Sequence, residues 1–498
     1  MDLYQTKVQP FGLRRLNLRK NGYMLTFIKK LIPQAIKNTY HLKLAILANL
    51  WYGFPSNELK VIGVTGTNGK TTTVQMITRI LEEAGFKTAA ISTINFKIDR
   101  KEWINTTKFT TLSSFAIQKF IREAVRSGCE YLVLETSSHA LDQYRTWGIN
   151  YKIAVITNVT REHLDYHRTM DEYRRAKLKL FKKAQVAIVN LDMENTSYFL
   201  QFNNKDKFGY TTQNQNAKIK NQNDPNKSLR DNGASNAKCK IISAENIEPG
   251  IDYSKFIINN QQFMISLPGL FNIENALAAI CVGLSEDINL EKISQALGKL
   301  KGVPGRLEYV SNNKELNIII DYAVTPDSLE KLYKLIKQIK EVRPPSTLTA
   351  KGGQTSKDSR VIAVFGACGE RDRGKRPIMG EIVSQYADYI IVTNEDPYHE
   401  NPQKIIDEVF AGAIPHPPTP SPDGRGWPVR PGEGKTEGIN SFRILDRRKA
   451  IKKALQIAKP GDFVIITGKG AEETMAVRDK RIPWNDKKVI QEVLQELK

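Results

Sequence analysis

A glycine-rich run after an apolar stretch carries the clearest chemistry of this 498-residue chain. It reads VIGVTGTNGKTTT over residues 61–73, so that Lys70 and Thr71 open a helix directly after the glycines. The backbone N–H groups of such a loop bind phosphate oxygens, its lysine reaches the β- and γ-phosphates, and its hydroxyl binds Mg²⁺. Because Val64 stands where the common GxxxxGK[ST] pattern has its first glycine, we predict a variant nucleotide loop. The residues expected to bind ATP here are Gly66, Thr67, Asn68, Gly69, Lys70, Thr71 and Thr72.

Glu135 stands where α/β enzymes place their active sites, at the carboxyl end of a strand, and two further residues follow it in the sequence. Glu135 ends one strand-like run, His163 follows another by a few residues, and Lys177 lies on the next helical stretch. Taken alone, Lys177 is typical of a solvated helix lysine and His163 of a structural histidine. We interpret His139 and His167 as structural or hydrogen-bonding residues.

The elements that must position these residues alternate between short β-branched runs and helical stretches. Strand-like runs span residues 61–65, 131–135, 153–157 and 186–190, and helical stretches span residues 70–84, 113–127 and 170–182. After Pro304 the alternation restarts, with strands at 316–321, 361–365, 389–392 and 463–467. Such alternation predicts two α/β units, each with a mostly parallel sheet covered on both faces.

Composition and charge exclude several protein classes. Hydrophobic residues make up 40% and charged residues 26% of the chain, which is typical of a globular protein of about three domains. No run approaches the ~20 apolar residues of a membrane span. The four cysteines form no CxxC pair, and no signal peptide is evident, so we predict a cytoplasmic protein. The net charge of +21 favours anionic partners, but no nucleic-acid-binding signature accompanies it, and we expect no nucleic acid.

The N-terminal residues and three polar segments interrupt the α/β pattern. Residues 24–54 carry apolar side chains at helical spacing, and Pro33 interrupts this pattern. Residues 1–50 of the chain contain nine Lys/Arg and one acidic residue. This pattern predicts either a helix packed on the main body or a basic amphipathic element in weak peripheral contact with a membrane. Segments 213–240, 344–359 and 414–438 are rich in polar residues, glycine or proline, and the last two are expected to be disordered insertions.

The chain resembles the Mur ligases, which are ATP-dependent amide-bond-forming enzymes of peptidoglycan precursor synthesis, and in particular their UDP-N-acetylmuramyl-tripeptide synthetase branch. The resemblance covers residues 60–498 apart from the variable segments. The motifs that carry it are GVTGTNGKTTT, ETSSHALDQYR (135–145), TNVTREHLDYH (157–167), YRRAKLKLF (173–181), FNIENALAA (271–279), VPGRLE (303–308), DYAVTPDSLEK (321–331), GACGERDRGKRPIMG (366–380) and TGKGAEE (467–473).

The resemblance implies an α/β fold with three parts. Residues 1–58 would be a short basic helical segment, residues 59–306 a central P-loop-type ATPase domain with a parallel sheet, and residues 307–498 a Rossmann-like α/β domain that binds the amino acid. Relatives carry a full uridine-binding domain before the ATPase domain, and 58 residues are too few for it. Uridine recognition is therefore expected to differ, and a lipid-linked acceptor is an alternative.

The implied reaction has two steps. A carboxylate attacks the γ-phosphate of ATP to give an acyl phosphate, and an amine then displaces phosphate. The resemblance implies two Mg²⁺ ions, with Thr71, Glu135, His163 and a carbamylated Lys177 as metal ligands and Lys70 on the γ-phosphate. It also assigns further residues to ATP. Asn275 would lie near the adenine, Arg306 near the phosphates or ribose, and Asp321 would orient the nucleotide.

The substrate residues also follow from the resemblance. Those expected to hold the anionic muramyl-peptide acceptor are Thr110, Thr111, Ser137, Gln143 and Arg145. Those expected to hold the incoming amino acid are Arg371, Glu395, Asp396, Pro397, Tyr398, Gly468 and Glu472. The chain departs from the family at Leu112, where proline is usual, at Val324, where histidine is usual, and at Tyr398, where diaminopimelate-adding relatives have arginine.

These departures bear on substrate choice. Tyr398 cannot replace the bidentate grip of arginine on a second carboxylate, whereas Glu395 and Asp396 suit a side-chain ammonium such as that of lysine or ornithine. We predict a ligase that adds the third residue of the stem peptide to a UDP-N-acetylmuramoyl-L-alanyl-D-glutamate-type acceptor. The alternatives are another Mur-like ligase, folylpolyglutamate synthase-like or directed at lipid II, and a nucleotide-binding relative that has lost catalysis.

Overall fold

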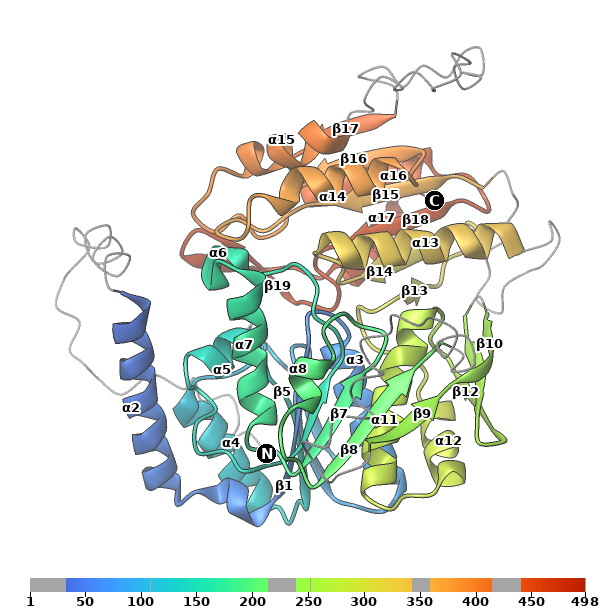
Figure 1. Ribbon diagram of the computed structural model, residues 1–498. Coiled ribbons are helices and arrows are strands. Elements are labelled where there is room, and N and C mark those ends of the chain that lie inside the picture. Colours follow the sequence, from blue (N-terminus) through green and yellow to red (C-terminus); the bar gives the residue numbers. More distant parts are fainter. Residues whose placement is uncertain are drawn as a thin grey trace, which may run out of the picture.

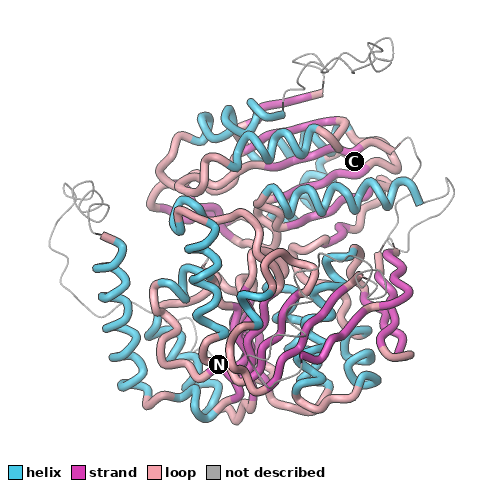
Figure 2. Tube along the Cα trace, viewed as in Figure 1, coloured by secondary structure: helices cyan, strands magenta, loops and turns pink. Residues whose placement is uncertain are grey.

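The computed structural model describes residues 33–107, 109–213, 239–250, 252–342, 359–413 and 440–497. Two layered α/β bodies make up most of it, one around a nine-stranded sheet and one around a six-stranded sheet (Figure 1). Figure 2 shows strands sandwiched between helices in both bodies. The two predicted insertions lie almost entirely outside the described residues, as do most of segment 213–240 and residues 24–32 of the predicted N-terminal helix.

The first sheet has the strand order β4-β3-β2-β5-β1-β6-β7-β8-β9. From β2 to β9 in that order the strands run parallel, and β3 and β4 add an antiparallel edge. The four strands predicted for this half are all present, so the expectation of a mostly parallel sheet is confirmed. The strands are β1 (Lys60–Thr65), β2 (Thr88–Ile91), β3 (Asn95–Ile98), β4 (Lys101–Ile104), β5 (Tyr131–Glu135), β6 (Tyr151–Ile156), β7 (Val186–Asn190), β8 (Asp206–Thr211) and β9 (Cys239–Ser243).

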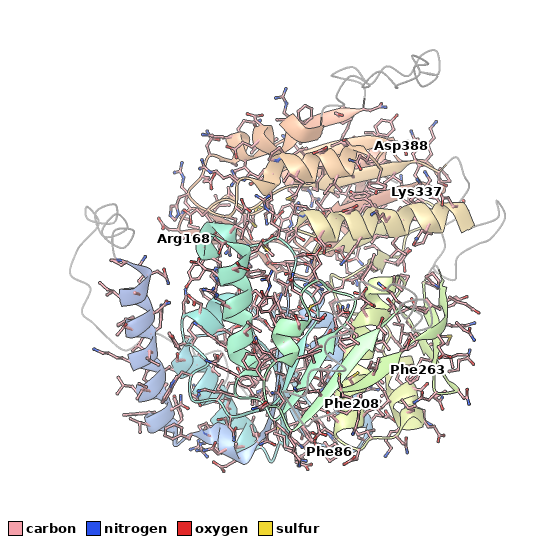
Figure 3. The ribbon with its side chains drawn as sticks, viewed as in Figure 1. Phe86, Arg168, Phe208, Phe263, Lys337 and Asp388 are labelled. Carbon is pink, nitrogen blue, oxygen red and sulfur yellow. The ribbon has the colours of Figure 1, made fainter. Side chains whose placement is uncertain are left out.

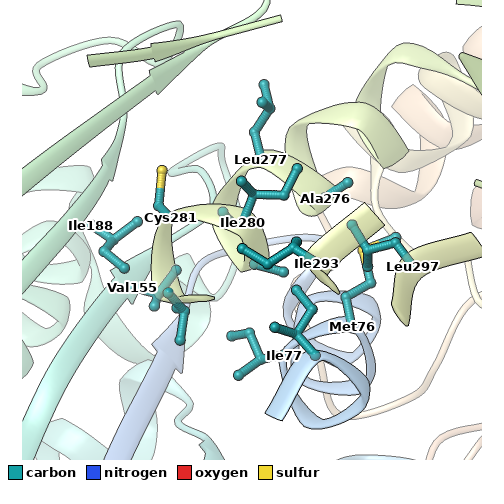
Figure 4. Close-up of a cluster of buried hydrophobic side chains, with 14 of the residues drawn as sticks. Met76, Ile77, Val155, Ile188, Ala276, Leu277, Ile280, Cys281, Ile293 and Leu297 are labelled. Carbon is teal, nitrogen blue, oxygen red and sulfur yellow. The ribbon is translucent and has the colours of Figure 1, made fainter. Parts of the chain in front are cut away.

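Helices cover both faces of this sheet because its central strands are apolar on both sides. On one face Ile77, Ile280 and Ile293 come from three different helices and pack against Val155 and Ile188 of the sheet (Figure 4). Those helices are α3 (Lys70–Glu83), α11 (Leu270–Ser285) and α12 (Leu290–Gly298). The other face is covered by α4 (Ser114–Arg126), α5 (Ser138–Asp142), α7 (Met170–Phe181) and α8 (Ser197–Leu200), and the short α6 (Leu164–His167) precedes α7.

A small antiparallel sheet lies beside this body. It consists of β10 (Glu245–Pro249), β11 (Ser254–Ile258) and β12 (Gln261–Ile265). Phe256 and Phe263 stack with ring centroids 5.2 Å apart, and Figure 3 labels Phe263 on this sheet. Both rings are buried, so the small sheet shares the core of the first body.

The second large sheet has the order β13-β14-β18-β15-β16-β17, and all its strands except β13 run parallel. The four strands predicted after Pro304 are all present, which confirms a second α/β unit. The strands are β13 (Glu308–Val310), β14 (Asn317–Asp321), β15 (Val361–Phe365), β16 (Tyr389–Thr393), β17 (Ser441–Ile444) and β18 (Phe463–Thr467). One face is covered by α13 (Pro326–Val342), α14 (Lys375–Ser384) and α15 (Pro402–Ala413), the other by α16 (Arg447–Ile457) and α17 (Asp486–Glu496).

The N-terminal helix α2 (Gln34–Tyr52) begins directly after Pro33 and ends at Gly53, and a short 3₁₀ turn, η1 (Pro55–Glu58), leads into β1. The predicted break at Pro33 is thus a helix start, as expected of a residue that cannot donate a backbone hydrogen bond. In Figure 1 α2 stands at the left edge of the molecule, packed beside α4. Within the described residues, no helix is long and apolar enough to cross a membrane.

Polar contacts join the two large bodies. Asn68 Nδ2 donates to Asp327 Oδ2 at 2.8 Å, and Lys375 Nζ donates to Glu162 Oε1 at 3.0 Å. The guanidinium of Arg481, on the hairpin of β19 (Thr474–Val477) and β20 (Lys480–Pro483), donates to the carbonyl oxygens of residues 106 and 107. The first two contacts start from loops at the carboxyl ends of β1 and β6, so the edge that should carry the site faces the second body.

Candidate active site

The glycine-rich loop is held by the strand-end residues beside it. Thr157 Oγ1 donates to the carbonyl oxygen of Asn68 at 2.6 Å. A Cβ at Gly66 would lie 1.8 Å from Thr157 Oγ1, and one at Gly69 would lie 2.2 Å from Asn275 Oδ1. Gly69 has φ +82° and precedes the first residue of α3, so only glycine fits both the space and the backbone conformation. The loop and the N-terminus of α3 thus form the phosphate-binding geometry that the sequence predicts.

Two lysines converge on one carbonyl oxygen of this loop. Lys70 Nζ donates to Gly66 O at 3.2 Å and to Thr67 O at 2.8 Å, while Lys177 Nζ donates to Gly66 O at 2.8 Å. The side chain of Lys177 comes from α7, is almost fully buried and lies over the ring of Tyr173. Burial and the neighbouring Lys70 charge hold the pKa of Lys177 well below its usual range. Burial also lowers the pKa of Lys70, although the charge of Glu135 opposes this shift.

Glu135 ends β5 and points its buried carboxylate at the start of α3. It accepts hydrogen bonds from Thr71 Oγ1 at 3.0 Å, from the backbone nitrogen of Thr93 at 2.7 Å and from Thr93 Oγ1 at 2.9 Å. Arg306 Nη2 lies 3.5 Å from the same Thr71 hydroxyl, and its guanidinium stacks over the ring of Tyr322. A carboxylate and a hydroxyl are the hard oxygen ligands that Mg²⁺ prefers, so Thr71 and Glu135 fit such an ion.

His163 lies in a cluster of aromatic rings between the two bodies. Its ring centroid is 4.6 Å from that of His139, which in turn lies 4.2 Å from that of Tyr166. Burial, followed by the charges of His139, Arg371, Lys177 and Lys375, holds the pKa of His163 well below its usual range. The neutral imidazole keeps a lone pair that can bind a metal. The charge of Arg371, a residue of the second body, thus affects the pKa of His163 in the first body.

The remaining histidines behave as the sequence predicts. Burial, with the charge of His167 next, lowers the pKa of His139 to about 3, and burial lowers that of His167 to about 4. His167 Nε2 lies 3.0 Å from Ser138 Oγ, which confirms a hydrogen-bonding position. In the described ranges, no group of three or more His, Cys, Asp or Glu side chains is arranged to hold a metal ion. The expected metal set instead mixes threonine, glutamate, histidine and lysine.

The other residues expected to contact ATP come from both bodies. Asn275, on α11, accepts from Thr73 Oγ1 at 3.3 Å beside Gly69. Asp321 ends β14 and accepts from the backbone nitrogen of Leu307 at 2.8 Å, and burial raises the pKa of its carboxyl. Val324, where the family usually has histidine, offers its carbonyl oxygen to Lys375 Nζ at 2.9 Å. Asn275 thus belongs to the first body and Asp321 and Val324 to the second.

The residues expected to hold the acceptor form a connected group next to Glu135. Thr111 Oγ1 donates to the carbonyl oxygen of Glu135 at 3.1 Å and accepts from the backbone nitrogen of Ser137 at 3.0 Å. Arg145 Nη1 donates to the carbonyl oxygen of Thr111 at 2.7 Å, and its buried Nε has no hydrogen-bond partner among the described residues. Thr110 Oγ1 lies 3.1 Å from Thr93 Oγ1, and Gln143 directly follows the last residue of α5. An unpaired guanidinium nitrogen suits an anionic acceptor.

The residues expected to hold the amino acid gather at the carboxyl ends of β16 and β18. Glu395 Oε1 accepts from Cys368 Sγ at 2.9 Å, whereas its buried Oε2 has no hydrogen-bond partner among the described residues. Gly468 lies against this carboxylate, since a Cβ there would be 2.5 Å from Oε2. The backbone of Pro397 packs against Gly369, two residues before Arg371. Burial raises the pKa of Glu395, so a cationic ligand at Oε2 would favour its charged form.

Glu395 and Asp396, the acidic pair expected from the sequence, lie in two different environments. Asp396 accepts from Lys469 Nζ at 3.0 Å with both carboxylate oxygens and from the backbone nitrogen of Ala476 at 2.6 Å. Lys469 also donates to Glu472, which accepts from the hydroxyl of Tyr322 at 3.1 Å. Lys469 thus pairs with Asp396 and Glu472, whereas Glu395 Oε2 has no hydrogen-bond partner among the described residues.

Sequence reasoning missed four residues that hold the site together. Thr93 binds Glu135, Lys469 neutralises Asp396, and the pair Lys375 and Glu162 joins the two bodies. Thr93 follows β2, so the rule that polar residues at strand ends gather at one edge could have found it. The partners of the two lysines come from distant segments, and no local pattern reveals such pairs.

Comparisons with known proteins agree with this geometry. Residues 64–283 match the profile of the Mur ligase middle domain, and residues 305–470 match that of the Mur ligase, glutamate ligase domain. A Clostridium tetani protein named UDP-N-acetylmuramoyl-L-alanyl-D-glutamate--2,6-diaminopimelate ligase is 35% identical over 493 residues, which are 98% of this chain and 86% of that protein. The Roseiflexus sp. UDP-N-acetylmuramyl-tripeptide synthetase is 33% identical, covering 91% of this chain and 82% of its own. The chain therefore belongs to the Mur ligase family.

Solved structures show the same fold. A structure of UDP-N-acetylmuramoyl-L-alanyl-D-glutamate--2,6-diaminopimelate ligase aligns with a TM-score of 0.51 and 26% identity, over 88% of this chain and 79% of that one. Folylpolyglutamate synthase of Mycobacterium tuberculosis aligns with a TM-score of 0.61 over 86% of this chain and 92% of that one. At 14% identity the second likeness concerns the fold alone.

The contact between Thr93 and Glu135 yields a first prediction. Thr93→Val removes a hydroxyl that positions the carboxylate but keeps the backbone hydrogen bond, so we expect the Mg²⁺ concentration for half-maximal ATP-dependent phosphate release to rise about 10- to 100-fold. A titration of phosphate release with Mg²⁺ measures this. Thr78→Val is the matched control, because its buried hydroxyl donates only to the carbonyl oxygen of Val74 in α3. Equal Mg²⁺ dependence of both variants would contradict a role of Thr93 at the metal site.

Proposed function

We propose that this Mur ligase family member is an ATP-dependent ligase that adds the third amino acid of the peptidoglycan stem peptide to a muramoyl-dipeptide acceptor of the UDP-N-acetylmuramoyl-L-alanyl-D-glutamate type. The observation that carries the proposal is that three sets of residues lie where the two bodies meet. They are the phosphate loop, the acceptor residues around Glu135 and the amino-acid residues around Glu395. The names of the relatives at 33–35% identity support the same reaction.

The first step needs positive charge around the γ-phosphate while the acceptor carboxylate attacks it. Lys70 and the N–H groups at the start of α3 supply fixed donors on one side, and Arg306 supplies a guanidinium on the other. Such preorganised charges stabilise the charge that develops on the phosphate oxygens. The bond between the γ-phosphorus and the bridging oxygen breaks, ADP leaves, and an acyl phosphate remains on the acceptor.

The second step forms the amide. The amino nitrogen attacks the acyl carbon, the bond from that carbon to the phosphate oxygen breaks, and the nitrogen loses a proton. In our proposal Arg371 holds the α-carboxylate of the amino acid, because its charge acts on His163. Although burial opposes the shift, Cys368 and Tyr398 in turn raise the pKa of Arg371. Holding the two reactants together in this way removes much of the entropic barrier to their reaction.

Bound Mg²⁺ would supply Lewis-acid charge to the transferring phosphate. We propose Thr71 and Glu135 as ligands of one ion, and Glu135, His163 and a carbamylated Lys177 as ligands of a second. The low pKa of Lys177 supports the carbamate, since only the neutral amine adds to CO₂. After loss of a proton the product would place a negative charge beside Lys70 in place of the neutral amine, and its oxygens would suit a hard cation.

The division of labour between the bodies follows the same proposal. Residues 59–306 would bind ATP and the acceptor, residues 307–498 the amino acid, and residues 1–58 would precede them as a short basic segment. Glu395 would receive the side-chain ammonium of the incoming residue through its unpaired Oε2. Tyr398 would line the same pocket, and its neutral phenol offers no charge to a second carboxylate.

The proposed reaction predicts a specific dependence of phosphate release. Release should need ATP, the muramoyl-dipeptide acceptor and an amino acid together, and Lys70→Ala should lower its rate on the order of 10²-fold or more. Lys299→Ala is the control, because Lys299 pairs with Glu83 on the surface. Phosphate release that continues without acceptor, or a Lys70→Ala variant with most of its activity, would contradict the proposal.

The pocket around Glu395 predicts a preference for lysine over meso-diaminopimelate. Lysine brings an ammonium to Glu395 and no second carboxylate, so we expect its kcat/KM to exceed that of diaminopimelate by roughly 10²-fold or more. Glu395→Gln should abolish most of this preference, whereas Glu473→Gln, an exposed neighbour in sequence of Glu472, should keep it. The measurement compares lysine, ornithine and diaminopimelate with one acceptor. Diaminopimelate as the best substrate would overturn this reading of the pocket.

A further inference from the structure

Helix α2 turns its large apolar side chains toward solvent. The exposed fractions are 59% for Ile36, 61% for Tyr40, 55% for Leu47, 61% for Leu50 and 79% for Trp51. These residues follow one another at helical spacing and therefore share one face of the helix. A water-facing side of a surface helix is normally polar, so this face is built to contact something apolar.

The opposite face of α2 packs on the body through small and polar residues. Ala45, Ala48 and Asn49 are buried, and Asn49 Nδ2 donates to the carbonyl oxygen of Trp147 at 2.7 Å. At the start of the helix, Asn38 Nδ2 donates to Asp142 at 3.1 Å and Gln34 Nε2 donates to Tyr166 at 2.8 Å. The usual arrangement is thus inverted, because the helix is fixed by its polar side and displays its apolar side.

Charge identifies the kind of surface that would cover this face. The 19 residues of α2 include Lys37 and Lys43 and no Asp or Glu, and Lys43 is exposed within the apolar stripe. The chain as a whole carries a net charge of +21. A second copy of the chain would bring like charges together at this face, whereas an anionic bilayer offers both opposite charge and an apolar phase. Aromatic residues such as Trp51 and Tyr40 are favoured at the interface of such a bilayer.

We propose that α2 binds the surface of an anionic lipid bilayer, with Ile36, Tyr40, Leu47, Leu50 and Trp51 inserted among the lipid headgroups and Lys37 and Lys43 near their phosphates. The partners of its polar start, Asp142 and Tyr166, adjoin the acceptor residues Gln143 and Arg145. If the proposed function holds, the bilayer would therefore lie beside the acceptor part of the site. The binding surface itself is independent of that function.

Vesicle sedimentation of the full chain tests the proposal. We expect the chain to sediment with vesicles that contain phosphatidylglycerol, not with pure phosphatidylcholine vesicles, and to dissociate as salt is added. Leu50→Gln/Trp51→Gln should weaken binding to the anionic vesicles by about tenfold or more. The matched control is Met264→Gln/Leu445→Gln, which replaces two exposed apolar residues outside α2. All four side chains are exposed, so the thermal midpoint should stay near that of the wild type.

Any of three results would overturn the proposal. They are failure of the chain to bind anionic vesicles, binding by the α2 variant as tight as that of the control, and a wild-type dimer that the α2 variant loses. The last result would assign the face to contacts between copies. Phosphate release with a water-soluble acceptor should be unchanged in the α2 variant, because Leu50 and Trp51 lie outside the catalytic residues. A wild-type chain that fails to bind vesicles but keeps ligase activity would therefore contradict only the membrane proposal. A chain that binds vesicles but has no ligase activity would contradict only the proposed function.

Discussion

Two amines share one carbonyl oxygen, and the rest of the site is arranged around that constraint. Lys70 and Lys177 both donate to Gly66 O, and burial with mutual repulsion lowers the pKa of Lys177 far below that of a free lysine. Like charges this close in a weakly solvated site are costly unless one is neutral or an anion lies between them. In the proposed mechanism, ATP phosphates on Lys70 and a carbamate on Lys177 would both relieve the repulsion. The two converging amines thus favour negative charge beside the loop.

The second body completes this arrangement rather than adding a separate site. Asp327 holds Asn68 of the loop, and Lys375 reaches Glu162, whose charge acts on Lys70. Arg371 acts on His163 in the first body while its own loop packs against Pro397 in the second. In the proposed function the substrates would touch both bodies at this boundary, so a change in the relative position of the bodies would disassemble the site.

Much of this could be predicted from the sequence, for a physical reason. The strands and the loop are local features, set by β-branched runs and by glycines where no Cβ fits, so their bounds agree within a few residues. The contact between Thr93 and Glu135, the balance of Asp396 by Lys469 and the outward turn of α2 depend on segments that are distant in sequence. Periodicity predicts a helical pattern within residues 24–54, but it cannot show that the small and polar side of α2 packs on the body.

The most direct test of the central constraint is the chemical state of Lys177. The ¹³C NMR spectrum of the enzyme in ¹³C-labelled bicarbonate at neutral pH should show a carbamate carbonyl resonance, because burial and the charge of Lys70 lower the pKa of Lys177 and so enlarge the fraction of neutral amine. Lys177→Arg should lose this resonance. Lys179→Arg, which changes a lysine of the same helix that pairs with Asp142, should keep it. A spectrum without the resonance in the wild-type enzyme, or with the resonance in Lys177→Arg, would contradict the account.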